Sequence, residues 1–217
     1  MFSFVKSWSR NFFGIPMDSA NETMRERTLA LKRVFQMRRH IQDHPTKIED
    51  GLYVGSIQTA KNKAELKRLN ITHILTVANY MIPLYPNEFV YKIINVPDKQ
   101  DADIKQYFDD CINFIDEAKR TGGGVLVHCV VGKSRSMAMA IPDLPSILVT
   151  SCSVTIVVAY LMKKQGMSKS EALQHVRSKR PIASPNPGFR VQLKDFEKSL
   201  HGGQSFYSFK AKKFVVY

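Results

Sequence analysis

A short apolar run that ends in a cysteine and a glycine-containing loop constrains this chain more than any other stretch. Residues 125–127 are apolar and predict a buried strand, Cys129 stands at its end, and Arg135 follows six positions later. Gly132 lets the backbone aim several amide groups at one point. The guanidinium of Arg135 matches two oxygens of a phosphate at once. The stretch therefore predicts a strand that leads into a loop able to wrap a tetrahedral dianion.

The thiol of Cys129 is a candidate nucleophile in this loop. A free thiol has a pKa of about 8.5, so the thiolate needs stabilisation at neutral pH. Inward-pointing amides, a helix that starts behind the loop and Arg135 would all supply it, and Ser136 could donate its hydroxyl to the sulfur. The alternative is a small buried core residue, but the spacing of these residues favours phosphoryl transfer to cysteine. The predicted phosphate-binding residues are Val130, Val131, Gly132, Lys133, Ser134 and Arg135.

Composition limits the class of protein. The 217 residues allow one domain of ordinary size plus tails, and 44% hydrophobic with 24% charged residues is usual for a soluble globular chain. Three cysteines suit neither a disulfide framework nor a paired zinc site, so we expect a reducing compartment, the cytoplasm and as a second location the nucleus.

The net charge of +13 indicates an acidic partner. Phosphorylated protein, an acidic calmodulin-like protein, nucleic acid and anionic lipid would all be attracted. The basic residues are spread over several segments and form no single stripe, so we expect no nucleic-acid ligand. The longest apolar stretch, 147–162, spans 16 residues, fewer than the roughly 18–20 of a membrane helix, so we expect no transmembrane segment.

Two terminal extensions differ from the rest of the chain. Residues 1–44 are basic and aromatic at the start, and they fit a floppy tail, an amphipathic segment for a membrane surface or partner, or a transit peptide. Within them, 22–41 predicts a basic amphipathic helix, either a calmodulin-like target or a solvated helix. Residues 201–217 form a short basic aromatic tail for which we predict no structure.

Residues 45–200 should form the compact domain. The pattern alternates strands and helices, which favours an α/β sheet, and Cys111 falls on the apolar face of the clearest helix. The predicted elements are a hairpin at 48–55, a helix at 57–69, strands at 71–77 and 89–96, a helix at 103–120, a helix opened by the capping box of Ser168 and Glu171, and a final helix at 186–200.

Cleavage of a phosphate ester also needs an acid to protonate the leaving oxygen. A positioned carboxylic acid contributes about 100- to 10,000-fold. The polar loop before the helix at 103–120 holds three candidates, and the pattern alone does not choose among Asp98, Asp101 and Asp103.

The motif His128-Cys129-x5-Arg135-Ser136 resembles the signature of the cysteine-based protein tyrosine phosphatases. Residues 45–200 are similar to the dual-specificity branch of that superfamily, most of all to the small plant enzymes. The further matching motifs are 51–55, 72–75, Tyr107-Phe108, 114–116, 159–162, Arg180-Pro181 and Pro185-Asn186.

The resemblance implies a mostly parallel twisted sheet flanked by helices and a two-step hydrolysis without cofactor or metal. In the family the acid precedes the aromatic pair by nine residues, which is Asp98 here, nine before Tyr107. Cys129 would attack phosphorus while Asp98 protonates the leaving oxygen, and Ser136 would assist departure of the sulfur. His128 and Asn186 would support the site. The implied substrates are phosphotyrosine and phosphoserine/threonine in signalling proteins, with mitogen-activated protein kinases as the family's example.

The chain departs from the family directly after Ser136. Residues 137–153 intervene before the family's next helix, and removing these 17 residues would join Ser136 to Val154 without interruption. We interpret 137–153 as an insertion, such as a retained intron or a gene-model error. The helix behind the loop would then be a stub broken by Pro142 and Pro145, or the site would be misassembled.

Two other functions stay open. A damaged site would leave a phosphoprotein-binding module without turnover. A phosphoinositide phosphatase is the third hypothesis, although lipid-directed relatives often carry a Lys directly after the cysteine, where this chain has Val130.

Overall fold

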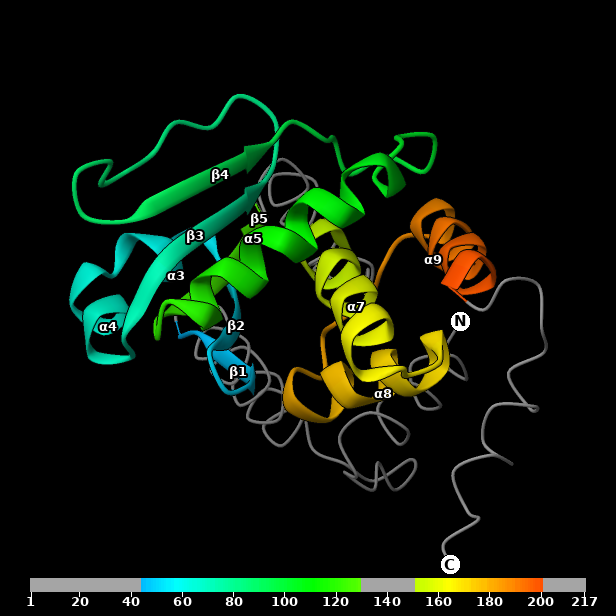
Figure 1. The fold of residues 1–217 in the computed structure, drawn as a ribbon. Coiled ribbons are helices and arrows are strands. Elements are labelled where there is room, and N and C mark those ends of the chain that lie inside the picture. The colour runs from blue at the N-terminus through cyan, green and yellow to red at the C-terminus, as the bar shows by residue number, and fades with distance from the viewer. Residues whose placement is uncertain (1–43, 130–150, 201–217) are drawn as a thin grey trace, which may run out of the picture. The chain divides into compact units, whose positions relative to one another are not determined.

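One five-stranded sheet forms the centre of the chain in the computed structural model, which describes residues 44–129 and 151–200 (Figure 1). The strands lie in the order β1-β2-β5-β3-β4. β1 pairs antiparallel with β2, and the other neighbours are parallel, so the predicted mostly parallel α/β sheet is confirmed. The strands are β1 (Thr46–Glu49), β2 (Leu52–Ser56), β3 (Ile71–Val77), β4 (Val90–Ile94) and β5 (Gly124–Cys129).

The hairpin of β1 and β2 forms where the Asp50-Gly51 turn predicts it. Gly51 has a φ of 74°, a conformation that glycine adopts without steric cost. The turn places Glu49 opposite Leu52 and brings β2 beside β5.

The two faces of β5 carry different parts of the core. Val125, Val127 and Cys129 belong to the larger core, which includes residues of the helices α5 (Phe108–Arg120) and α7 (Ser151–Gln165). Leu126 belongs to a smaller core with Ala60 and Leu66 on the opposite face. Side chains of a strand alternate between faces, so the position of Cys129 aims its thiol at the α5 and α7 side.

The helices begin and end close to the predicted boundaries. The predicted helix at 57–69 is two helices, α3 (Ile57–Lys61) and α4 (Lys63–Arg68), because Asn62 ends the first and its side chain caps Glu65 of the second. A 3-10 turn, η1 (Lys105–Tyr107), precedes α5, and Cys111 is buried on α5 as predicted. The C-terminal helices are α8 (Lys169–Lys179), with the predicted Ser168 capping box, and α9 (Pro187–Leu200).

The run 154–158 is β-branched and reads as a strand on its own, yet it lies inside α7 as the family resemblance implies. Every residue from Cys152 to Met162 is buried. A helix that is apolar all round is stable when other elements cover all its sides, and β2, β5, α5, α8 and α9 all lie against α7. The long buried helix that the resemblance implies is thus present from Ser151 onward, and the expected stub directly after Ser136 lies outside the described residues.

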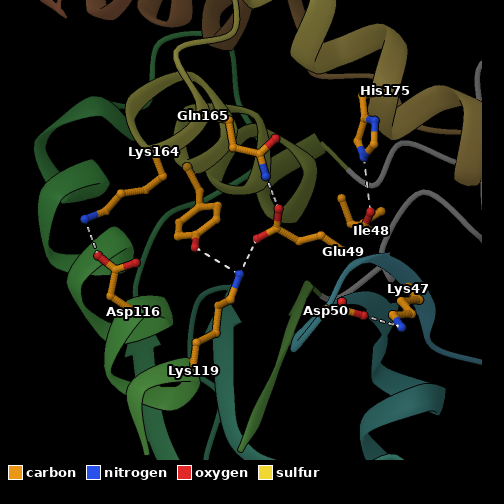
Figure 2. Close-up of polar contacts among 10 residues, drawn as sticks. Lys47, Ile48, Glu49, Asp50, Asp116, Lys119, Lys164, Gln165 and His175 are labelled. Atoms are coloured by element: carbon orange, nitrogen blue, oxygen red, sulfur yellow. Dashed lines mark hydrogen bonds and ion pairs between the residues drawn. The ribbon is translucent and has the colours of Figure 1, made fainter. Parts of the chain in front are cut away.

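A polar cluster holds the C-terminal end of α7 (Figure 2). Glu49 of β1 accepts hydrogen bonds from Lys119 and Gln165, and the Lys119 ammonium also donates to the hydroxyl of Tyr160 over 3.3 Å. Lys164 pairs with Asp116 of α5. The cluster lies where α5 leads into β5, at the opposite end of that strand from Cys129. It links β1, α5 and α7 by side chains from all three elements.

Predictions for 1–43 and 201–217 lie outside the described residues, as does most of the expected insertion. The last three residues of the insertion, 151–153, are the first three of α7. Within the described ranges, no helix is both long enough and apolar enough to cross a membrane.

Candidate active site

The carboxyl ends of the parallel strands bring two predicted site residues to one edge of the sheet. Cys129 is the last residue of β5, and Asp98 lies four positions after the end of β4. β3 lies between these two strands and runs in the same direction. The loop after β4 can therefore reach toward the thiol, since ligands in such sheets bind beyond the carboxyl ends of the strands.

The thiol of Cys129 is enclosed. The residue is 3% exposed, and its Sγ accepts a hydrogen bond from the hydroxyl of Ser153 over 3.4 Å. Burial raises the pKa of the Cys129 thiol, and the hydroxyl and backbone N–H of Ser153 act against that rise. The first turn of α7 thus supplies two groups that favour the thiolate.

A buried cation, Arg180, also acts on the thiol. Arg180 is fully buried, and its Nη1 donates to the Thr46 hydroxyl over 2.8 Å. Burial lowers the pKa of Arg180 to about 10, so the guanidinium is still charged at neutral pH. Its charge lowers the pKa of Cys129, although less than Ser153 does. The sequence motif Arg180-Pro181 matched the family, but it gave no sign of this electrostatic role.

His128 faces away from the thiol and joins β5 to β3. Its Nε2 is hydrogen-bonded to Thr76 Oγ1 over 2.8 Å, and the two residues are register partners. Burial lowers the pKa of His128 to about 4, against a smaller opposite effect of a backbone hydrogen bond at Cys129. The imidazole is therefore neutral near pH 7, and it fixes the strand end that carries the nucleophile.

Asp98 is exposed and held in place by Asn186. The Asn186 side-chain amide donates to Asp98 Oδ1 over 2.9 Å, and its own oxygen accepts from the Phe189 N–H over 2.9 Å as a cap of α9. The charge of Asp98 raises the pKa of the Cys129 thiol. The carboxylate is thus close enough to the sulfur for their charges to interact.

The loop that carries Asp98, residues 97–105, is called the acid loop below. Its later residues are also held by α9. Gln192 accepts from the N–H groups of Ile104 and Lys105, both over 2.9 Å, and donates to the Ala102 carbonyl over 2.8 Å. A Cβ on Gly188 would lie 1.8 Å from the backbone oxygen of Gln100, so the loop and the helix touch directly. Sequence analysis missed Gly188 and Gln192, since the loop and α9 are about ninety positions apart in sequence.

The other two candidate acids have different surroundings. Asp103 Oδ1 accepts from the Gln106 N–H over 3.3 Å, which caps the turn that opens α5. Asp101 is exposed in the same loop. Of the three carboxylates, Asp98 is the one whose charge contributes to the raised pKa of the Cys129 thiol.

Several predicted site residues lie outside the described ranges. They are Val130, Val131, Gly132, Lys133, Ser134, Arg135 and Ser136. The described part of the site therefore consists of Cys129, Asp98 and the residues that contact or act on them. These are Asn186 and Gln192 at the Asp98 loop, and Ser153, Arg180 and His128 at the cysteine. Within these ranges no group of three or more His, Cys, Asp and Glu could hold a metal ion.

A cysteine at the end of a central parallel strand and the Asp98 loop at the same edge are the arrangement that the phosphatase resemblance implies. Residues 52–142 and 150–199 match the model of the dual specificity phosphatase catalytic domain. The chain therefore belongs to the dual-specificity phosphatase family and is a protein phosphatase.

Relatives and solved structures agree with the family. Dual specificity protein phosphatase 1 of Arabidopsis thaliana is 51% identical over 195 residues, which cover 89% of this chain and 90% of that one. MAP kinase phosphatase with leucine-rich repeats protein 1 of Dictyostelium discoideum is 44% identical over 156 residues, 72% of this chain and 16% of that one. The crystal structure of DUSP15 is similar with a TM-score of 0.59 and 34% identity, covering 76% of this chain and 99% of that one.

Proposed function

We propose that the chain hydrolyses phosphotyrosine and phosphoserine/threonine in proteins through a phosphocysteine at Cys129. The observation that supports the proposal most is the position of Asp98 on a loop that Asn186 and Gln192 fasten to α9, at the sheet edge where the buried Cys129 ends β5. Nucleophile and acid thus stand at one edge of the sheet on supported elements.

In the first step the Cys129 thiolate attacks phosphorus and a sulfur–phosphorus bond forms. The bond to the leaving oxygen breaks, and Asp98 gives its proton to that oxygen. In the second step Asp98 takes a proton from water, the water oxygen attacks phosphorus, and the sulfur–phosphorus bond breaks to return the thiolate. Arg135 and the amides of 130–135 are proposed to hold the equatorial oxygens throughout.

The proposed substrates are phosphorylated kinases of the mitogen-activated type. The support is the Dictyostelium relative, which is named a MAP kinase phosphatase, together with a net charge of +13 that attracts doubly phosphorylated protein segments. The exposed position of Asp98 suits substrates of more than one kind.

A phosphoprotein-binding module without turnover is the second candidate. One observation favours it: burial raises the pKa of the Cys129 thiol, which disfavours the nucleophilic thiolate. The same residues would then bind a phosphoprotein without cleaving it.

Steady-state assays with phosphotyrosine and phosphothreonine peptides separate these candidates. We expect turnover of both peptides by the full chain, none by Cys129→Ser, and a strongly reduced kcat with Asp98→Ala. Binding of the peptides without turnover would support the second candidate. Turnover of inositol lipids in preference to both peptides would contradict the assignment to protein substrates.

A further inference from the structure

The hydroxyl that contacts the nucleophile belongs to Ser153, the last residue of the expected insertion 137–153. Ser153 stands in the first turn of α7, and its Oγ lies 3.4 Å from the sulfur of Cys129. Its side chain is fully buried, so bulk water cannot replace the hydroxyl. The two residues are 24 positions apart, and Ser153 is the residue directly before Val154.

We propose that Ser153, and not Ser136, supplies the hydroxyl that stabilises the Cys129 thiolate as nucleophile and as leaving group. The inference rests on the proposed phosphocysteine mechanism and assigns one of its roles to a different residue. In the second step, the sulfur–phosphorus bond breaks with both electrons going to sulfur. The Ser153 O–H then donates a hydrogen bond to the new thiolate, and no proton is transferred.

The sequence order is compatible with this assignment. Removing 137–153 leaves Arg135-Ser136-Val154, and removing 136–152 leaves Arg135-Ser153-Val154, so both give the same three residue types. Sequence alone therefore cannot say which serine belongs before the helix. The structure places Ser153 there, because Val154 and the rest of α7 follow it without a break.

Contacts along the whole of α7 fix the position of Ser153. At the C-terminal end, Tyr160 and Gln165 bind the pair of Lys119 and Glu49 (Figure 2). In the same last turn, on the exposed side of the helix, Lys163 pairs with Asp109 of α5 over 2.7 Å.

The middle of α7 lies in the main core with Ile156 and Leu161 fully buried. Each such side chain contributes about 1.5–3 kcal/mol when buried. These contacts hold the first turn of α7 against Cys129 whatever path the chain takes between 130 and 150.

Electrostatics explain why the hydroxyl matters at this thiol. Cys129 and Ser153 are both buried, so the cost of an unsolvated thiolate is high. Among the residues that the structure describes, Ser153 is the strongest of the groups that act against this cost, ahead of the charge of Arg180. A hydrogen bond to a charged group in such surroundings is stronger than one to a neutral group.

The test is a pH titration of the Cys129 thiol by alkylation with iodoacetamide in the full chain. Mass spectrometry of the Cys129 peptide separates its reaction from that of Cys111 and Cys152. We expect Ser153→Ala to reduce the thiolate fraction below the pKa about ten- to a hundredfold, and Ser153→Thr, which keeps a hydroxyl, to restore most of it. Ser178→Ala, which removes an exposed serine hydroxyl from α8, is the matched control.

The same titration on Ser136→Ala decides between the two serines. A larger shift for Ser153→Ala than for Ser136→Ala supports the proposal, and the opposite order overturns it. Thermal unfolding of each variant is recorded beside the titration. If Ser153→Ala does not fold, the Ser136→Ala titration decides: an unchanged pKa of Cys129 supports the proposal, and a raised pKa overturns it. If Cys129 of the wild-type chain forms a thiolate that Ser153→Ala weakens, but the wild-type chain turns over no phosphopeptide, the result contradicts the proposed function and not the role of Ser153.

Discussion

Replacing Gly188 by alanine would place a Cβ atom 1.8 Å from the backbone oxygen of Gln100. Real Cβ contacts essentially never fall below 3.0 Å, so the acid loop would have to retreat by at least about 1.2 Å. The contact is with backbone, which cannot rotate away as a side chain does. A displacement of about 1 Å costs up to about 100-fold in rate when it misplaces a reacting group. We therefore expect a loss of roughly that size in the step that needs Asp98.

The assay compares two small substrates that differ in their need for an acid. Phenyl phosphate has a basic leaving oxygen that must be protonated, whereas para-nitrophenyl phosphate has a good leaving group. We expect Gly188→Ala to lower kcat much more for phenyl phosphate. The control is Gly166→Ala, in the turn between α7 and α8, where a φ of 64° strains any side chain but nothing lies within 4 Å. Equal losses on both substrates, or equal losses in both variants, would refute the reasoning.

Three further perturbations test separate parts of the site. Asn186→Ala removes the donor to Asp98 and the cap on the Phe189 N–H. We expect the free energy of unfolding, measured in denaturant, to fall by about 1 kcal/mol. We also expect a lower kcat on phenyl phosphate, and no further loss of kcat when Asn186→Ala is added to Asp98→Asn. Burial lowers the pKa of His128 from 6.5 to about 4. The unfolded chain then binds a proton in this window that the folded chain does not, so the free energy of unfolding should fall by up to about 3 kcal/mol as the pH drops from about 6.5 to about 4, and His128→Asn should flatten that profile. Deletion of 137–153 should raise both phosphatase activity and the thermal midpoint, because it shortens the connection to α7 and puts the Ser136 hydroxyl directly before Val154 in place of Ser153. Equal or lower values of both would refute this expectation.

Much of the fold follows from local patterns. The turn at Asp50-Gly51, the capping box at Ser168 and the apolar face of α5 each fixed an element close to its observed ends. The break at Asn62 did not stand out, because asparagine is a common surface residue and its capping role depends on the next turn. The β-branched run 154–158 misleads on propensity, since burial on every side decides its conformation.

The candidate site was less accessible to sequence reasoning than the fold. The cysteine is marked by its own neighbours, and the choice of Asp98 among three acids needed the family's spacing. The groups that act on these two residues come from elements distant in sequence. Ser153 and Arg180 lower the pKa of the Cys129 thiol, and Gln192 binds the backbone of the loop that carries Asp98. Such contacts depend on how α7, α8 and α9 pack, which no local pattern contains.

The most direct test of the account is chemical identification of the phosphorylated intermediate. The full chain is mixed with para-nitrophenyl phosphate, quenched in alkali during turnover and digested for mass spectrometry. We expect one phosphate on the peptide that carries Cys129, and neither phosphopeptide nor turnover with Cys129→Ser. Turnover without phosphate on Cys129, or a Cys129→Ser chain as active as the wild type, would contradict the phosphocysteine mechanism.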